Sequence, residues 1–231
     1  MIKKVIRKLS SLYPLVKKSI NFTKDYLKYK KNIAIYSKIV EEYTFTSEQK
    51  SLLIISGRGM NISWAQIWTF LSLAAFKKNY RVIVLTFKNN NLLNKYYSLM
   101  PIKKIYFEDF ENEVSADISL ELQDQIDKLV SFEEYKSFYY SDTPIGQIAL
   151  STYSRHLGTG LIEVEKPSVK KIINEWIIIL IRYIKISELI YDRYKIKAIF
   201  VTEVFLEEYG SFYFTAINKE LNVIRFAGTA R

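Results

Sequence analysis

Three short polar segments of this chain contain residues of the types that bind or transform ligands. The first follows the apolar run 51–56 and consists of Gly57, Arg58, Gly59, Met60 and Asn61. Its glycines let the backbone approach a ligand, the helix start that follows favours negative charge, and Arg58 offers a fork of hydrogen-bond donors. The segment predicts a site for an anionic ligand; the alternative is an ordinary glycine turn. It is not a dinucleotide-binding fingerprint, because Ile62 stands where a third glycine is expected, and no Gly-Lys-Ser/Thr phosphate loop occurs.

The second segment lies between a predicted strand and a predicted helix and contains Thr202, Glu203, Tyr209 and Gly210. Glu203 comes just past the strand end, where a carboxylate can act as a base or bind sugar hydroxyls. The alternative is that Glu203, like Glu207 and Glu208, is a solvated loop charge.

The third segment, 151–156, is the densest polar group in the chain and is followed by Gly158 and Gly160. Here His156 is the only histidine. The neighbouring Arg155 disfavours the imidazolium form, which suits a neutral base near pH 7. The alternative is a helix cap or a surface residue. Glu203 and His156 are therefore the candidates for a catalytic base, and the sequence does not decide between them.

Strands and helices alternate along the chain and must position these segments. Apolar runs predict strands at 51–56, 81–87, 104–107, 198–202 and 222–226. Helical spacing predicts helices between them, among them 145–157, 168–194 and 210–221, and the acidic stretch 108–142 is expected to form helices and loops on the outside. The near-continuous apolar strands are typical of a sheet covered on both faces. We therefore predict an α/β fold with a Rossmann-like, mostly parallel sheet flanked by helices. In such sheets ligands bind beyond the carboxyl ends of the strands.

Composition excludes several classes of protein. The 231 residues include no cysteine and one histidine, so disulfide scaffolds, thiolate metal centres and multi-histidine sites are excluded, and no metal site is predicted. The net charge of +10 is concentrated in residues 1–42, which carry +8, whereas residues 107–142 carry −9. A nucleic-acid-binding domain would be expected to carry its basic residues on one face of the fold, so nucleic acid is not expected as a partner.

Residues 1–45 are interpreted as a basic amphipathic helical arm, and residues 46–231 as the Rossmann-like α/β domain. Within residues 1–20, apolar side chains recur at helical spacing with lysines and arginines between them. Such a helix can lie on an anionic membrane surface, or it can pack its apolar side on the domain. The arm has no continuous apolar core and no cleavage site, so it is not a secretory signal. With no cysteine and no export signal, we expect a cytoplasmic protein that is peripheral at the inner face of the membrane if the arm binds lipid.

The order of several motifs resembles a known family of enzymes. These are the strand and turn 53–61, Ile145-Gly-x-x-Ala149 leading to Ser154-Arg155, and Phe200-Val-Thr-Glu203 with Tyr209-Gly-Ser-Phe-Tyr213. Together they resemble the N-terminal half of bacterial GT-B glycosyltransferases of capsule and surface-polysaccharide biosynthesis. The resemblance implies two facing Rossmann-like halves, of which the first mainly holds the acceptor and the second the nucleotide-sugar. It also implies a metal-independent reaction without a cofactor.

This resemblance predicts transfer of a sugar from a nucleotide-sugar to a glycan or lipid-linked acceptor. Residues 57–61, 155–156 and 202–210 would face the cleft. Because the sequence stops at Arg231, just after a strand, we expect that the donor half is missing here or is supplied by a second domain or subunit, without which the chain would be inactive. The alternative function is a non-catalytic Rossmann-like protein that binds the membrane or a partner in polysaccharide assembly.

Overall fold

The chain folds around a parallel β-sheet. The structure is a computed structural model that describes residues 27, 30, 31, 34, 49–57, 62–98, 100, 102–114, 118–158 and 160–225. In this part of the chain, five strands form one sheet: β1 (Lys50–Ile55), β2 (Tyr80–Thr86), β3 (Lys103–Tyr106), β4 (Ile196–Val201) and β5 (Asn222–Arg225). Their order is β3-β2-β1-β4-β5, and all four pairings between neighbours are parallel. The predicted Rossmann-like α/β fold is therefore confirmed.

The three central strands are buried on both faces. Every residue of β1 from Ser51 onward is buried, as are the last five residues of β2 and the last four of β4. Because both faces of these strands are covered, their sequences show no alternation of polar and apolar residues. The edge strands β3 and β5 are more exposed, and β5 has no buried residue.

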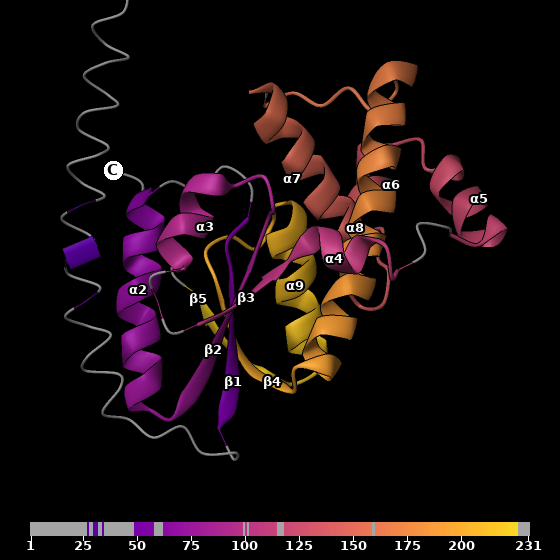
Figure 1. Ribbon diagram of the computed structural model, residues 1–231. Coiled ribbons are helices and arrows are strands. Elements are labelled where there is room, and N and C mark those ends of the chain that lie inside the picture. Colours follow the sequence, from indigo (N-terminus) through magenta and orange to yellow (C-terminus); the bar gives the residue numbers. More distant parts are fainter. Residues whose placement is uncertain are drawn as a thin grey trace, which may run out of the picture.

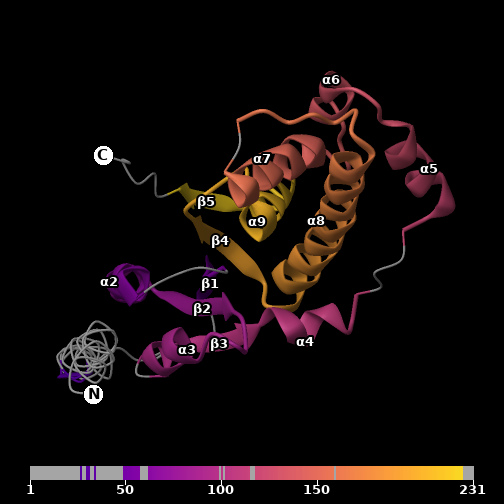
Figure 2. The same cartoon turned by 90° about the horizontal axis from the view of Figure 1, so that it is seen from above.

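Helices cover the two faces of the sheet in separate layers (Figures 1 and 2). Helices α2 (Ile62–Lys77) and α3 (Asn91–Tyr97) cover one face, where Trp68 packs edge-on against Phe200 of β4. The carboxyl half of α8 (Pro167–Arg193) and α9 (Glu207–Asn218) cover the other face, where Phe212 packs against Phe107 and Tyr191. The chain therefore leaves β1 and β4 toward opposite faces of the sheet.

A second core lies beyond the sheet, among helices only. The amino half of α8 packs there with α5 (Leu120–Lys128), α6 (Phe132–Lys136) and α7 (Ile145–Leu157). Tyr135 is fully buried in this core, and its hydroxyl donates to Asn174 Oδ1 of α8 at 2.5 Å. The acidic stretch does form helices and loops on the outside of the sheet, as predicted. Its apolar residues also contribute to the separate helical core, which was not predicted.

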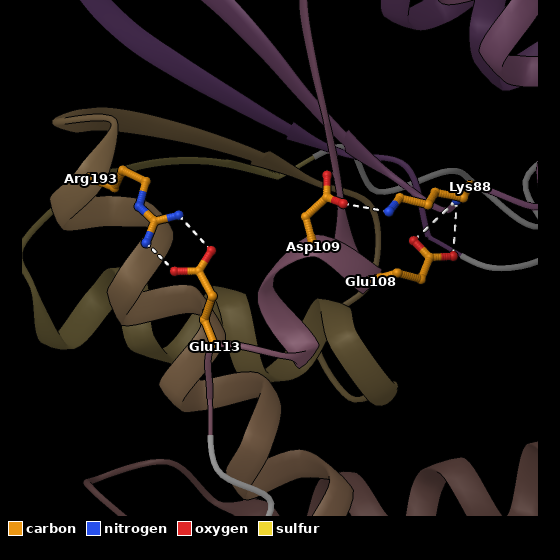
Figure 3. A network of polar contacts seen from close by, with 5 residues as sticks. All are labelled: Lys88, Glu108, Asp109, Glu113 and Arg193. Atoms are coloured by element: carbon orange, nitrogen blue, oxygen red, sulfur yellow. Dashed lines mark hydrogen bonds and ion pairs between the residues drawn. The ribbon is translucent and has the colours of Figure 1, made fainter.

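Ion pairs hold the short helix α4 (Phe107–Glu111), which follows β3 directly, to its surroundings (Figure 3). Lys88, after β2, contacts Asp109 at 2.5 Å, and its backbone N–H donates to Glu108 Oε1 at 2.9 Å. Arg193, at the end of α8, forms two hydrogen bonds with the Glu113 carboxylate. The bond to Asp109 raises the pKa of Lys88, and the bonds from Arg193 lower the pKa of Glu113. These contacts join α4 to the loop after β2, and the residues just after α4 to the end of α8.

One predicted boundary differs from the structure by a full turn of helix. Helix α9 begins at Glu207, one turn before the predicted start at residue 210, because Glu207 and Glu208 supply negative charge to its first turn. Tyr209 therefore lies inside the helix and not in the loop before it, and Gly210 is the fourth residue of the helix rather than the first. The predicted arm falls almost entirely outside the described residues; Leu27, Lys30, Lys31 and Ala34 are helical.

Candidate functional site

The direction of the chain changes between β1 and β4. From β1 the chain proceeds through α2 to β2 on one side, and from β4 through α9 to β5 on the other. In open parallel sheets, the loops that diverge at such a switch point leave a crevice beyond the carboxyl ends of the strands. Ser56 and Gly57 follow β1 at this edge, and Thr202 and Glu203 follow β4. This edge is therefore where a ligand site is expected.

A pocket of about 380 Å³ lies at the carboxyl ends of β4 and β5. Helix α7, the loop between β4 and α9, and the last residue of β5 supply its lining residues, which are Ser151, Ser154, Arg155, Glu203, Val204, Phe205, Leu206 and Arg225. The two predicted site residues Arg155 and Glu203 thus share one pocket although 48 positions separate them. Their side chains form an ion pair of 3.5 Å between Nη1 and Oε1, and both remain about half exposed. A ligand can therefore reach both charges.

The loop from β4 to α9 is fastened to α7 at both of its ends. Glu203 pairs with Arg155 at the start of the loop. At its end, the Glu207 carboxylate contacts His156 Nε2, and the Glu207 N–H donates to Thr152 Oγ1 at 3.1 Å. Thr152 and His156 are four residues apart and so lie on one side of α7. The conformation of the pocket loop thus depends on α7.

His156 does not line the pocket. Its ring stacks on Trp176 of α8, with the ring centres 5.2 Å apart and the planes at 17°. Because Nε2 faces the Glu207 carboxylate, that nitrogen carries the proton in a neutral ring, and Nδ1 is the nitrogen able to accept one. The geometry gives His156 a fixed orientation beside the pocket, whereas Glu203 lies in the pocket wall.

Gly57 lies against α9 on the other side of the switch point. Its backbone N–H donates to the Tyr209 hydroxyl at 2.9 Å. A Cβ at this position would lie 2.2 Å from Glu208 Oε1 and 2.5 Å from the Tyr209 hydroxyl. Glu208 is 1% exposed, so it is not a solvated loop charge. Burial, together with the nearby carboxylate of Glu208, raises the pKa of Tyr209 well above its usual value. In this arrangement the close approach to Gly57 is made by the protein's own side chains.

Gly210 and Thr202 lie at the base of the same edge. A Cβ on Gly210 would lie 2.9 Å from the Val204 carbonyl oxygen, so this glycine lets the loop pack on α9. The Thr202 side chain is buried at the end of β4, and its hydroxyl has no hydrogen-bond partner among the described residues.

Apart from His156, which lies beside the pocket, the predicted site residues fall into three groups. Arg155 and Glu203 line the pocket; Gly57, Tyr209, Gly210 and Thr202 lie at or near the junction of β1, β4 and α9. The prediction for Arg58, Gly59, Met60 and Asn61 falls outside the described residues. That any of these residues binds a ligand stays a prediction.

Phe205 and Leu206 belong to the range 202–210 that was predicted to face the cleft, whereas Arg225 was not predicted as a site residue. Arg225 is the last residue of β5 and the penultimate residue of the strand predicted at 222–226, and this position near the carboxyl edge is the signal that could have found it. Ser151 and Ser154 belong to the predicted polar segment 151–156 and line the pocket. Thr152 and His156 of the same segment contact Glu207 instead.

No group of three or more histidine, aspartate or glutamate side chains within the described ranges is arranged to hold a metal ion. Over the same residues, no helix combines the length and the apolar character needed to cross a lipid bilayer.

Comparison with known proteins gives no further support for a function. No family model, no curated protein and no solved structure matches this chain.

Proposed function

We propose that this chain is the acceptor-binding half of a glycosyltransferase that acts in surface or capsular polysaccharide biosynthesis. The single observation that carries the proposal is the pocket that brings Glu203 and Arg155 together at the carboxyl edge of the sheet. A carboxylate and a guanidinium side by side can each bind adjacent sugar hydroxyls, the carboxylate as acceptor and the guanidinium as donor. The resemblance to GT-B enzymes supports the same assignment.

The remaining lining residues suit a saccharide as well. Ser151 and Ser154 add hydroxyl groups that can donate and accept hydrogen bonds. The exposed ring of Phe205 supplies an apolar surface, as in ligand pockets that combine apolar walls with a few placed polar groups. The volume of about 380 Å³ falls at the lower end of the range for small-molecule sites.

In the proposed reaction, Glu203 accepts the proton of the acceptor hydroxyl. The oxygen of that hydroxyl forms a bond to the anomeric carbon of the donor, the bond from this carbon to the phosphate oxygen breaks, and the nucleotide leaves with the bonding electrons. Glu203 is preferred over His156 as the base because Glu203 lines the pocket, whereas Nε2 of His156 is engaged by Glu207. The donor would be bound by a second domain or subunit, and Arg58 would help to bind its phosphates.

The test is donor consumption with the chain supplied together with a donor-binding domain. We expect release of the nucleotide from one member of a panel of nucleotide-sugars when an acceptor glycan is present, and a rate reduced about 10²–10⁴-fold by Glu203→Gln. Glu165→Gln is the matched control, because residue 165 is also a glutamate but does not line the pocket. No release with any donor, or full activity of Glu203→Gln, would overturn the assignment.

The same experiment separates the enzyme from the alternative of a non-catalytic binding protein. That alternative predicts binding to anionic vesicles that depends on residues 1–20, without consumption of any nucleotide-sugar. Vesicle binding together with donor consumption would instead indicate an enzyme that meets a lipid-linked acceptor at the membrane surface.

A further inference from the structure

We infer that the pocket recognises an acceptor saccharide that carries a negatively charged group, a carboxylate or a phosphate. This inference rests on the proposed function and names the class of acceptor. It is carried by Arg225, which lines the pocket from the end of β5 together with Arg155 of α7.

The charges of the pocket do not cancel. Arg155 has a partner in Glu203, at 3.5 Å. Arg225 forms no ion pair with any described residue, although it lines the same pocket. Two guanidinium groups and one carboxylate leave the lining with a surplus of one positive charge. A ligand with one negative group would neutralise this surplus, whereas a neutral sugar would not.

The chemistry of the lining favours an oxygen-rich anion. A guanidinium group presents parallel N–H donors that match the two oxygens of a carboxylate or of a phosphate. Ser151 and Ser154 place hydroxyl groups in the same pocket. An anionic group beside Arg225 would leave Glu203 and Arg155 for the neutral hydroxyls of the sugar ring, with Phe205 along its apolar side.

The experiment compares pairs of probes that differ in this one group. The affinity of the full chain is measured by NMR titration for methyl glucuronide against methyl glucoside, and for glucose 6-phosphate against glucose, at one ionic strength. We expect the acidic member of at least one pair to bind about tenfold tighter, which corresponds to about 1.4 kcal/mol. The two pairs distinguish a carboxylate from a phosphate.

Arg225→Gln tests the assigned residue. This variant should lose the preference for the acidic probe and keep its affinity for the neutral one. Arg193→Gln is the control, because Arg193 is paired with Glu113 away from the pocket, and it should keep the preference. Arg225 is exposed on an edge strand, so its replacement should leave the melting temperature unchanged.

The remaining outcomes separate this inference from the proposed function. Equal affinity for both members of each pair would overturn the inference and leave the saccharide pocket standing. A preference that persists in Arg225→Gln would also overturn it. If no probe binds, both the inference and the assignment of the pocket to an acceptor fail, whatever the donor assay shows.

Discussion

Replacing Gly57 by alanine should destabilise the junction between β1 and α9. The new Cβ would lie 2.2 Å from Glu208 Oε1 and 2.5 Å from the Tyr209 hydroxyl, whereas ordinary contacts begin near 3.4 Å. Both side chains must therefore move by about 1 Å. Although these atoms are the ends of side chains, Glu208 is 1% and Tyr209 6% exposed, so neither has free space to enter.

The expected cost has two contributions. The movement breaks the 2.9 Å hydrogen bond from the Gly57 N–H to the Tyr209 hydroxyl, and leaving buried polar groups unsatisfied costs about 1–3 kcal/mol. The forced displacement of packed side chains adds about 1–3 kcal/mol. A total of about 2–6 kcal/mol should lower the melting temperature of a chain of this size by about 4–24 °C.

Thermal unfolding followed by circular dichroism provides the assay, with Gly160→Ala as the matched control. A Cβ on Gly160 has no atom within 4 Å, so the control should stay within about 0.5 kcal/mol of the parent chain. In a Tyr209→Phe background the alanine at position 57 should cost less, because the hydrogen bond from the Gly57 N–H is already absent there. The ring carbon Cζ, 2.6 Å from the new Cβ, obstructs it in both backgrounds. A melting temperature within 2 °C of the parent for Gly57→Ala, or an equal cost in both backgrounds, would refute the reasoning.

Three further substitutions probe the helical core and the pocket loop. Gly146→Ala should cost more than about 4 kcal/mol, because its Cβ would lie 1.7 Å from the backbone oxygen of Tyr135; a mild loss of stability in urea unfolding would contradict this. Burial raises the pKa of Tyr135 to about 12, so the stability it contributes is complete below pH ~10 and is lost as the pH rises from there toward 12. Tyr135→Phe should lower the free energy of unfolding at pH 7 by about 1 kcal/mol, because the hydrogen bond to Asn174 is lost. Above pH 10 the urea midpoint of this variant should fall less steeply with pH than that of the parent chain. An equal fall in both proteins would contradict the raised pKa of Tyr135. Thr152→Val should cost about 1 kcal/mol, because the buried hydroxyl accepts the Glu207 N–H, and should speed amide hydrogen exchange in residues 203–207; unaltered exchange there would mean that α7 does not hold the loop.

The sequence was sufficient to predict the sheet, because its signals are local. The apolar run Leu52–Ile55 is rich in isoleucine, short and bounded by turn residues, which favours a strand covered on both faces. Helix α7 ends at residue 157, as predicted from Gly158, which has a positive φ of 62°. The turns before β2, β4 and β5 also contain residues with positive φ, namely Asn79, Lys195 and Glu220. Only Asn79 is of a type that favours this conformation, so the other two turns had no local signal.

The helical core and the pocket could not be predicted, because they depend on contacts between distant residues. The apolar residues of α5 and α6 look like the inner side of helices on the sheet, and nothing local shows that they pack on the amino half of α8 instead. Likewise, no spacing in the sequence indicates that Arg155 meets Glu203 or that His156 stacks on Trp176. Glu208 was interpreted as a possible loop charge because the helix was predicted to start at residue 210. The helix starts at Glu207 instead, and this places the Glu208 side chain in the interior.

Helix α8 has a consequence for how the molecule unfolds. At 27 residues it is about 40 Å long, and one end is embedded in the helical core while the other supports the sheet. Because α8 contributes residues to both cores, unfolding of α8 in one core removes packing from the other. We therefore expect the two cores to melt in a single cooperative step, like one folding unit, although they share no strand.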